Sequence, residues 1–118
     1  MKQSIFLFLI IATIQTKGQI PKSGTYTYTI AFAEWNGKSN GATCKVVIKG
    51  DSIKVYHNGT RNLTGNKGEI LDQGIIMKHK KTDKYIIAHK LSDINAREIN
   101  GCEGPTIIDF IKKLFWTC

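Results

Sequence analysis

The sequence is poor in the features that mark special classes of protein. It has only two prolines among 118 residues and no low-complexity tract, which excludes collagen-like and disordered chains. No apolar run reaches the roughly 18 to 20 residues that a membrane-spanning helix needs. The chain is 42% hydrophobic and 22% charged, which is the balance of one compact domain. Two domains, a membrane-spanning helix and a coiled coil are therefore excluded.

The first residues have the pattern of an export signal. A cationic start precedes an apolar run over Ile5–Ile14, which suits a signal peptide and is too short to span a bilayer. Thr16 and Gly18 place small side chains at the two positions that a signal peptidase reads. We expect residues 1–18 to be a signal peptide and residues 19–118 to form a single domain that is periplasmic or secreted. The alternative is a buried N-terminal strand of an intracellular protein.

The stretch from Gly24 to Ala33 predicts a strand. β-Branched and aromatic residues alternate there with period two, which is the strongest strand signal a sequence can carry. Asn36–Gly37 and Asn40–Gly41 then mark a loop, since both residue types tolerate the positive φ of tight turns. One face of this strand carries Tyr26, Tyr28, Ile30 and Phe32, and the other carries Thr25, Thr27, Thr29 and Ala31.

Residues 42–57 predict a β-hairpin with a defined register. A two-residue Gly50–Asp51 turn pairs Ile48 with Ile53, Val46 with Val55 and Cys44 with His57. The hydrophobic pattern selects the same register, because every member of this set except His57 is apolar or a thiol. The opposite face carries Lys45, Lys49, Ser52, Lys54 and Tyr56, and we expect it to meet solvent.

Two further hairpins are predicted with three-residue loops. A loop at Lys81–Asp83 with Asp83 in the left-handed conformation would place His79 opposite Tyr85. A loop at Ile111–Lys113 would pair the last two strands. Residues 58–68 are expected to be mostly loop.

A succession of six or more short strands without a long helix predicts an antiparallel all-β domain. It closes as a small β-barrel or packs as a sandwich, and the sequence does not distinguish the two. The only helical segment expected is a turn over Ser92–Ile99 capped by Ser92.

Three cysteines leave one thiol over when a pair forms. We predict a Cys102–Cys118 disulfide, which would fasten the end of the last strand, because Gly101, Gly104 and their neighbours can turn the chain back. Cys44 would then be a buried free thiol, since it lies on the inward face of its strand. Pairs between Cys44 and either other cysteine remain open as alternatives.

Several groups of potentially reactive side chains could instead have purely structural roles. A zinc site is disfavoured because His79 and His89 fall at opposite ends of one predicted hairpin, about 13 Å apart at about 3.3 Å per residue. Cys44 opposite His57 could form a nucleophilic thiolate, but both lie on an inward face. The acids show no pairing that a glycosidase would need, and nucleotide, esterase and zinc-protease motifs are absent. No catalytic residue, metal or cofactor is predicted.

The residues that best suggest ligand binding are aromatic side chains and one acid. They lie on the first strand, on the loop edge that follows it and on the last strand. Such side chains could line a barrel mouth, where closed β folds commonly hold ligands. This candidate set is Tyr26, Tyr28, Glu34, Trp35 and Trp116.

The formal charge of +8 raises the possibility of an anionic partner. The lysines are spread over predicted strand faces and turns, and only Arg61 and Arg97 offer bidentate contacts, so no nucleic acid partner is expected. Charged strand edges also discourage aggregation, which explains most of this distribution. A glycan or an envelope or extracellular protein remains as a partner class.

Three blocks of sequence resemble small exported, β-rich proteins of Bacteroidetes. They are Ser23–Tyr28, Gly50–Val55 and Gly74–His79. The resemblance covers most of residues 19–118 and implies export and a compact β fold, but it carries no assigned activity.

The preferred function is non-catalytic binding of a small ligand or an extracellular partner by a monomeric, exported β-domain. The first alternative is an inhibitor of a secreted enzyme. A less favoured alternative is a small hydrolase or thiol enzyme that uses Cys44 and His57.

Overall fold

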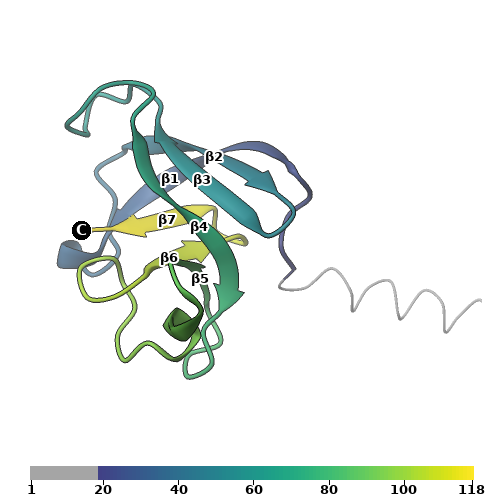
Figure 1. Cartoon of the computed structure of the whole chain (residues 1–118). Coiled ribbons are helices and arrows are strands. Elements are labelled where there is room, and N and C mark those ends of the chain that lie inside the picture. The colour runs from purple at the N-terminus through teal and green to yellow at the C-terminus, as the bar shows by residue number, and fades with distance from the viewer. Residues whose placement is uncertain (1–18) are drawn as a thin grey trace, which may run out of the picture.

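The computed structural model describes residues 19–118, so the predicted signal peptide lies outside the described residues. The chain forms a closed β-barrel whose seven strands follow one another in sequence order around the ring (Figure 1). Neighbouring strands are antiparallel except β1 and β7, which pair in parallel and close the ring. The strands are β1 (Gly24–Phe32), β2 (Thr43–Lys49), β3 (Ser52–His57), β4 (Ile70–Lys78), β5 (Tyr85–Ala88), β6 (Thr106–Asp109) and β7 (Leu114–Thr117). The barrel, and not the sandwich, is therefore the all-β architecture of this protein.

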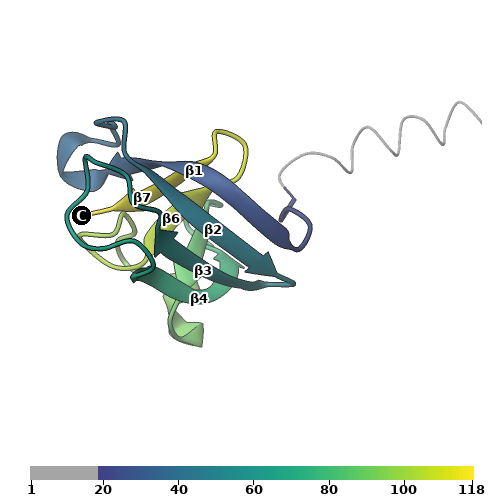
Figure 2. The same cartoon turned by 90° about the horizontal axis from the view of Figure 1, so that it is seen from above.

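The ring has two unlike ends. At one end the chain reverses in three short connections, and we call this the tight-turn end; its turns are β2–β3, β4–β5 and β6–β7. At the other end lie residues 33–42, 58–69 and 89–105, and we call this the long-loop end. The 58–69 loop projects beyond the strands (Figures 1 and 2).

The period-two pattern of the sequence fills the barrel. Tyr28, Ile30 and Phe32 of β1 point inward and are buried, while Tyr26 is only partly buried because it lies near the tight-turn end. Facing side chains from the other strands complete a single core. Its other fully buried members include Cys44, Val46, Ile48, Ile53, Val55, Ile87, Ile108 and Phe115.

The β2–β3 hairpin has the predicted register. Ile48 pairs with Ile53, Val46 with Val55, and Cys44 with His57. A two-residue turn leaves no freedom in the pairing, and a one-residue slip would turn the whole apolar face outward.

The predicted register of the β4–β5 hairpin is wrong by one residue. Lys78, and not His79, pairs with Tyr85, because the turn has four residues instead of three. The Asp83 amide donates to the His79 carbonyl, and the His79 amide donates to the Lys84 carbonyl. Asp83 does adopt the predicted positive φ, which is 64°. A left-handed residue before the second strand fits either loop length, so the sequence did not discriminate between them.

The β6–β7 hairpin deviates in the same way. Asp109 pairs with Leu114, so the turn again holds four residues, and its last residue, Lys113, has a φ of 57°. The helical turn after β5 is a 3-10 segment, η2 (Leu91–Asn95), whose N-cap position is Lys90. Ser92 therefore lies inside this turn and does not cap it.

The long-loop end is fastened by a disulfide between Cys102 and Cys118, with a Cα–Cα distance of 4.8 Å. The predicted pairing is therefore correct, and Cys44 is free and buried. Among residues 19–118, no helix is long and apolar enough to cross a membrane.

Candidate functional site

The predicted binding residues fall in three separate places. Tyr28 is 2% exposed and belongs to the core, so it lines no cavity within the barrel. The Tyr26 hydroxyl donates to the Lys22 carbonyl just outside β1. The described pocket that Trp116 lines includes neither of these tyrosines.

Glu34 and Trp35 lie away from both tyrosines. They belong to a 3-10 turn, η1 (Ala33–Trp35), that follows β1 at the long-loop end. The Trp35 ring is 49% exposed and packs on Phe32 with 4.9 Å between ring centroids, and Glu34 is exposed. One exposed indole and one exposed acid do not enclose a ligand.

Trp116 is the predicted residue that lines a pocket. This barrel-end pocket has a volume of about 330 Å³ and lies between the β4–β5 and β6–β7 turns. The Trp116 indole ring packs closely against Gly37, because a Cβ at Gly37 would come within 2.5 Å of the ring. The pocket walls are mainly apolar and include Tyr85, Ile107, Phe110, Ile111, Leu114 and Trp116.

A row of aromatic rings connects this pocket to the core. Phe110, in the β6–β7 turn, lies 5.2 Å from Tyr85 and 6.5 Å from Tyr28 between ring centroids. Tyr28 in turn lies 6.3 Å from Tyr26. Each ring meets its neighbour edge-on or tilted, which is the geometry that aromatic pairs prefer. The row gives the pocket a rigid inner wall.

The charged side chains around the pocket are three lysines and two acids, and several of them make contacts within the protein. Lys78 Nζ lies 3.9 Å from Asp83 Oδ1 and 5.5 Å from the centre of the Tyr85 ring. Asp109 Oδ1 accepts hydrogen bonds from the amides of Ile111, at 3.0 Å, and of Lys112, at 2.9 Å. Both acids of the pocket are thus engaged with the protein itself.

Cys44 and His57 face each other across β2 and β3, but their contacts do not support a thiolate nucleophile. Burial raises the pKa of the Cys44 thiol to about 12, so the thiol is protonated at neutral pH. His57 Nδ1 accepts from the Gly59 amide at 2.9 Å, and its Nε2 is 3.2 Å from the Leu63 carbonyl and donates to it. The imidazole therefore anchors the 58–69 loop and is not available as a base for the thiol.

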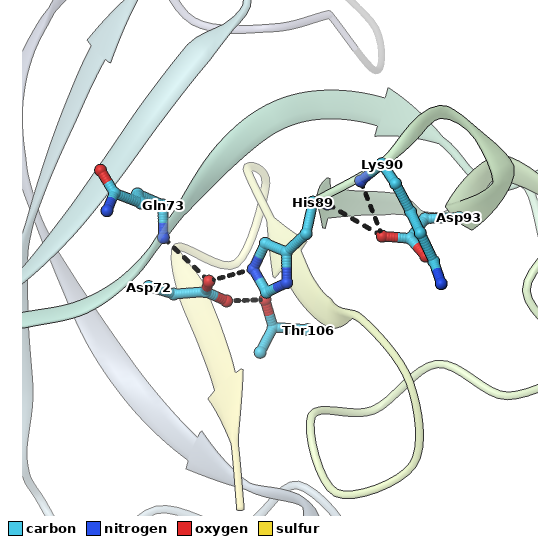
Figure 3. A network of polar contacts seen from close by, with 6 residues as sticks. All are labelled: Asp72, Gln73, His89, Lys90, Asp93 and Thr106. Carbon is cyan, nitrogen blue, oxygen red and sulfur yellow. Dashed lines mark hydrogen bonds and ion pairs between the residues drawn. The ribbon is translucent and has the colours of Figure 1, made fainter.

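A second polar site closes a gap in the barrel, and it was not predicted. The last residue pair between β4 and β5 is Ile75 with Ala88, so the first half of β4 has no strand neighbour on that side. The Asp72 side chain fills this gap (Figure 3). Its Oδ1 accepts from His89 Nε2 at 2.6 Å and from the Gln73 amide at 2.8 Å, and its Oδ2 accepts from Thr106 Oγ1 at 2.6 Å.

The Asp72 carboxylate is almost fully buried, whereas the His89 ring is largely in solvent. Their side chains are 8% and 60% exposed, respectively. A buried carboxylate is stable only when it is paired and hydrogen-bonded, and three donors meet that need here. Asp93 supports the arrangement from η2, because its Oδ2 accepts from the amides of His89 at 2.8 Å and of Lys90 at 3.3 Å.

An imidazole oriented by a carboxylate can serve general acid–base chemistry. In the described part of the chain, however, no hydroxyl or thiol is bonded to the other ring nitrogen of His89. The same carboxylate also joins β4 to β6 through Thr106. These contacts therefore give Asp72 a structural role, because it links β4 to β6 where β4 is no longer paired with β5.

Sequence reasoning missed the polar link and most of the pocket. Asp72 carried no signal, because its inward position follows only from the pairing of β4 with β3, in which it lies opposite Val55. The pocket residues Tyr85 and Phe110 carried none, because the pocket arises where two turns meet. Within residues 19–118 no three His, Cys, Asp or Glu side chains are grouped as a metal site would require.

Comparisons with protein-family models, with curated proteins and with solved structures find no match for this chain.

Proposed function

We propose that this protein is a non-catalytic, exported binding domain that holds a small ligand in the barrel-end pocket. The observation that carries the proposal is the mainly apolar wall of this pocket beside the buried core of the barrel. Its volume of about 330 Å³ is at the lower end of the range of small-molecule sites, roughly 300 to 1,000 Å³. A ligand of about two fused or linked rings suits that size.

The rigidity of the pocket supports binding without chemistry. Phe110 packs against both Tyr28 and Tyr85, so the inner wall is formed before a ligand arrives. Preformed walls reduce the entropy that binding costs. No nucleophile of raised reactivity lines the pocket, and Cys44 is buried elsewhere with a pKa of about 12.

Export is the other part of this proposal. It is supported by the signal-like residues 1–18 and by a disulfide, which persists in oxidising compartments. We expect mass spectrometry of the protein from its native source to show a chain that begins at Gln19. A chain that retains Met1 would contradict export by cleavage.

Binding is tested with N-phenyl-1-naphthylamine, a neutral two-ring dye that fluoresces in apolar sites. A Trp35→Phe variant leaves Trp116 as the single tryptophan, so energy transfer from Trp116 to the dye reports occupancy of this pocket. We expect saturable dye fluorescence together with quenching of Trp116. Absence of saturable binding would refute the proposed function.

Two exposed apolar side chains make a matched pair of variants. Ile111, 77% exposed, borders the pocket, and Leu91, 79% exposed, lies outside it. Ile111→Ser should weaken dye binding severalfold because it removes apolar surface from the site. Leu91→Ser should leave the affinity unchanged, and equal losses in both variants would point to non-specific adsorption.

The thiol-enzyme alternative has its own test. Alkylation of the native protein should leave Cys44 unmodified, because the side chain is inaccessible and its thiol is protonated. Rapid alkylation would favour a reactive thiol and would contradict the buried environment described above.

A further inference from the structure

We propose that the ligand of the barrel-end pocket is an apolar anion, with a ring body and one negatively charged group that Lys84 and Lys112 bind. This inference rests on the proposed function and specifies its ligand class. The two lysines come from the two turns that frame the pocket. A ligand whose body enters between the turns would bring its charged group to both of them.

Lys84 and Lys112 are the two lysines of the pocket that form no ion pair within the described residues. Within the described residues, neither Lys84 nor Lys112 has a carboxylate within ion-pair distance. The third lysine, Lys78, lies near Asp83 and over the Tyr85 ring. Two unpaired ammonium groups beside an apolar wall favour a ligand that supplies both apolar surface and negative charge.

The backbone at both lysines is held in place. Thr82 Oγ1 accepts from the Lys84 amide at 3.3 Å, and His79 Nδ1 lies 2.9 Å from the same oxygen. Asp109 Oδ1 accepts from the Lys112 amide at 2.9 Å. The long side chains can still move, but each starts from a backbone position that is held by a hydrogen bond.

A cationic ligand is the opposing class, since acids and aromatic rings also border the pocket. The acids are already engaged, however. Asp83 faces Lys78, and Asp109 accepts two backbone amides, so neither is a free carboxylate. The Tyr85 ring has Lys78 over it, which occupies the face that a ligand cation would use. Lys78, Lys84 and Lys112 against Asp83 and Asp109 also leave the pocket positive.

Two dyes with the same rings separate charge from apolar contact. 1-Anilinonaphthalene-8-sulfonate and N-phenyl-1-naphthylamine differ only in the sulfonate group. We expect the sulfonated dye to bind roughly three- to tenfold more tightly, as two solvent-exposed charge contacts allow. Higher ionic strength should reduce this difference, because it screens exposed charges.

Paired lysine variants locate the effect. Lys84→Gln combined with Lys112→Gln should abolish the preference for the sulfonated dye, measured as the ratio of the affinities of the two dyes in the same variant. The control combines Lys49→Gln with Lys54→Gln, two exposed lysines of the β2–β3 hairpin, and it removes the same charge. This control should retain the preference.

The outcomes separate this inference from the proposed function. If neither dye binds, the proposed function fails, and this inference fails with it. If both dyes bind with equal affinity, only the assignment of an anionic ligand is overturned. The same holds if the control variant loses the preference as fully as the pocket variant, because the effect would then come from net charge alone.

Discussion

The two ends of the barrel are closed in different ways. At the tight-turn end the strands pair up to their turns, and backbone ladders hold β2 to β3, β4 to β5 and β6 to β7. At the long-loop end β4 parts from β5, and closure depends on the Asp72 side chain and on the disulfide between Cys102 and Cys118. Backbone ladders need little from particular side chains, whereas closure by side chains depends on single residues.

This difference also places the proposed binding site. The tight-turn end holds the barrel-end pocket on a frame of ladders, so its turns can carry functional side chains without supporting the fold. At the long-loop end the buried carboxylate and the disulfide are occupied in holding the chain together. We therefore expect substitutions at the tight-turn end to change binding and substitutions at the long-loop end to change stability.

The largest loss of stability is expected from a substitution in the β2–β3 hairpin, which runs between the two ends of the barrel. Val46 is fully buried on β2 and faces Val55, so Val46→Lys would bury an unpaired charge. We expect a loss of several kcal/mol in the free energy of unfolding, measured by urea denaturation. Lys54→Glu, on the exposed face of the same hairpin, should cost little. Equal losses would mean that the two faces are assigned the wrong way round.

Removing the disulfide should have the next largest effect. Cys102→Ser combined with Cys118→Ser releases a link between residues 16 apart in sequence. The chain-entropy model gives a loss of roughly 3 kcal/mol. Thermal unfolding of this variant should be compared with Cys44→Ala, which keeps the disulfide. A double variant as stable as the parent protein would show that the long-loop end holds without it.

Gly74 tests the point at which β4 leaves β5. A Cβ at this position would lie 2.2 Å from the Ala88 carbonyl oxygen, which is part of the backbone and cannot move freely. We expect Gly74→Ala to cost about 1 to 3 kcal/mol, as overpacking does. Gly24→Ala is the control, since its nearest contact would be 3.6 Å. Denaturation of the two variants should therefore separate them clearly.

Asp72→Asn tests closure by the side chain. The amide keeps the shape of the carboxylate but loses its charge, and it presents a donor to one of its former donors. We expect a loss of about 1 to 3 kcal/mol and faster hydrogen exchange near Thr106. Asp51→Asn, in the exposed β2–β3 turn, should change neither quantity. Unchanged exchange in the Asp72 variant would argue against its role as a link.

The smallest effect is expected at alkaline pH. The pKa of Cys44 rises from 9.0 to about 12 on folding, mainly because burial disfavours the thiolate. The folded state therefore keeps its proton where the unfolded state loses it, and stability falls as pH rises from 9.0 towards 12. Cys44→Ser should flatten this dependence in thermal unfolding measured across pH 9.0 and 10.0. An unchanged slope would mean that Cys44 does not contribute to it.

Local patterns in the sequence were sufficient for most of the fold. The strand β1 and the register of β2–β3 followed from period two and from a two-residue turn, which are properties of neighbouring residues. The Cys102–Cys118 pair followed from one cysteine at the chain end and a turn-rich segment before β6. The β4–β5 register failed because three-residue and four-residue turns can both place Asp83 in the left-handed conformation.

The candidate site was much harder to predict. Of the five residues expected to bind a ligand, Trp116 lines the barrel-end pocket, while Tyr28 is in the core and Trp35 lies on η1. An aromatic residue on a predicted strand is equally compatible with a position in the core and with a position in a binding site. Only the neighbours that other strands supply decide between the two.

The sequence by itself determined that the domain is built from short strands, the inward face of β2 and β3 and the register of their hairpin, because each depends on residues that are close along the chain. The tertiary structure alone decided that β7 pairs in parallel with β1, that Asp72 reaches Thr106, and that the turns after β4 and β6 enclose a pocket. These contacts join segments far apart in sequence. Their formation depends on how the whole ring closes, and no local pattern of side chains encodes that closure.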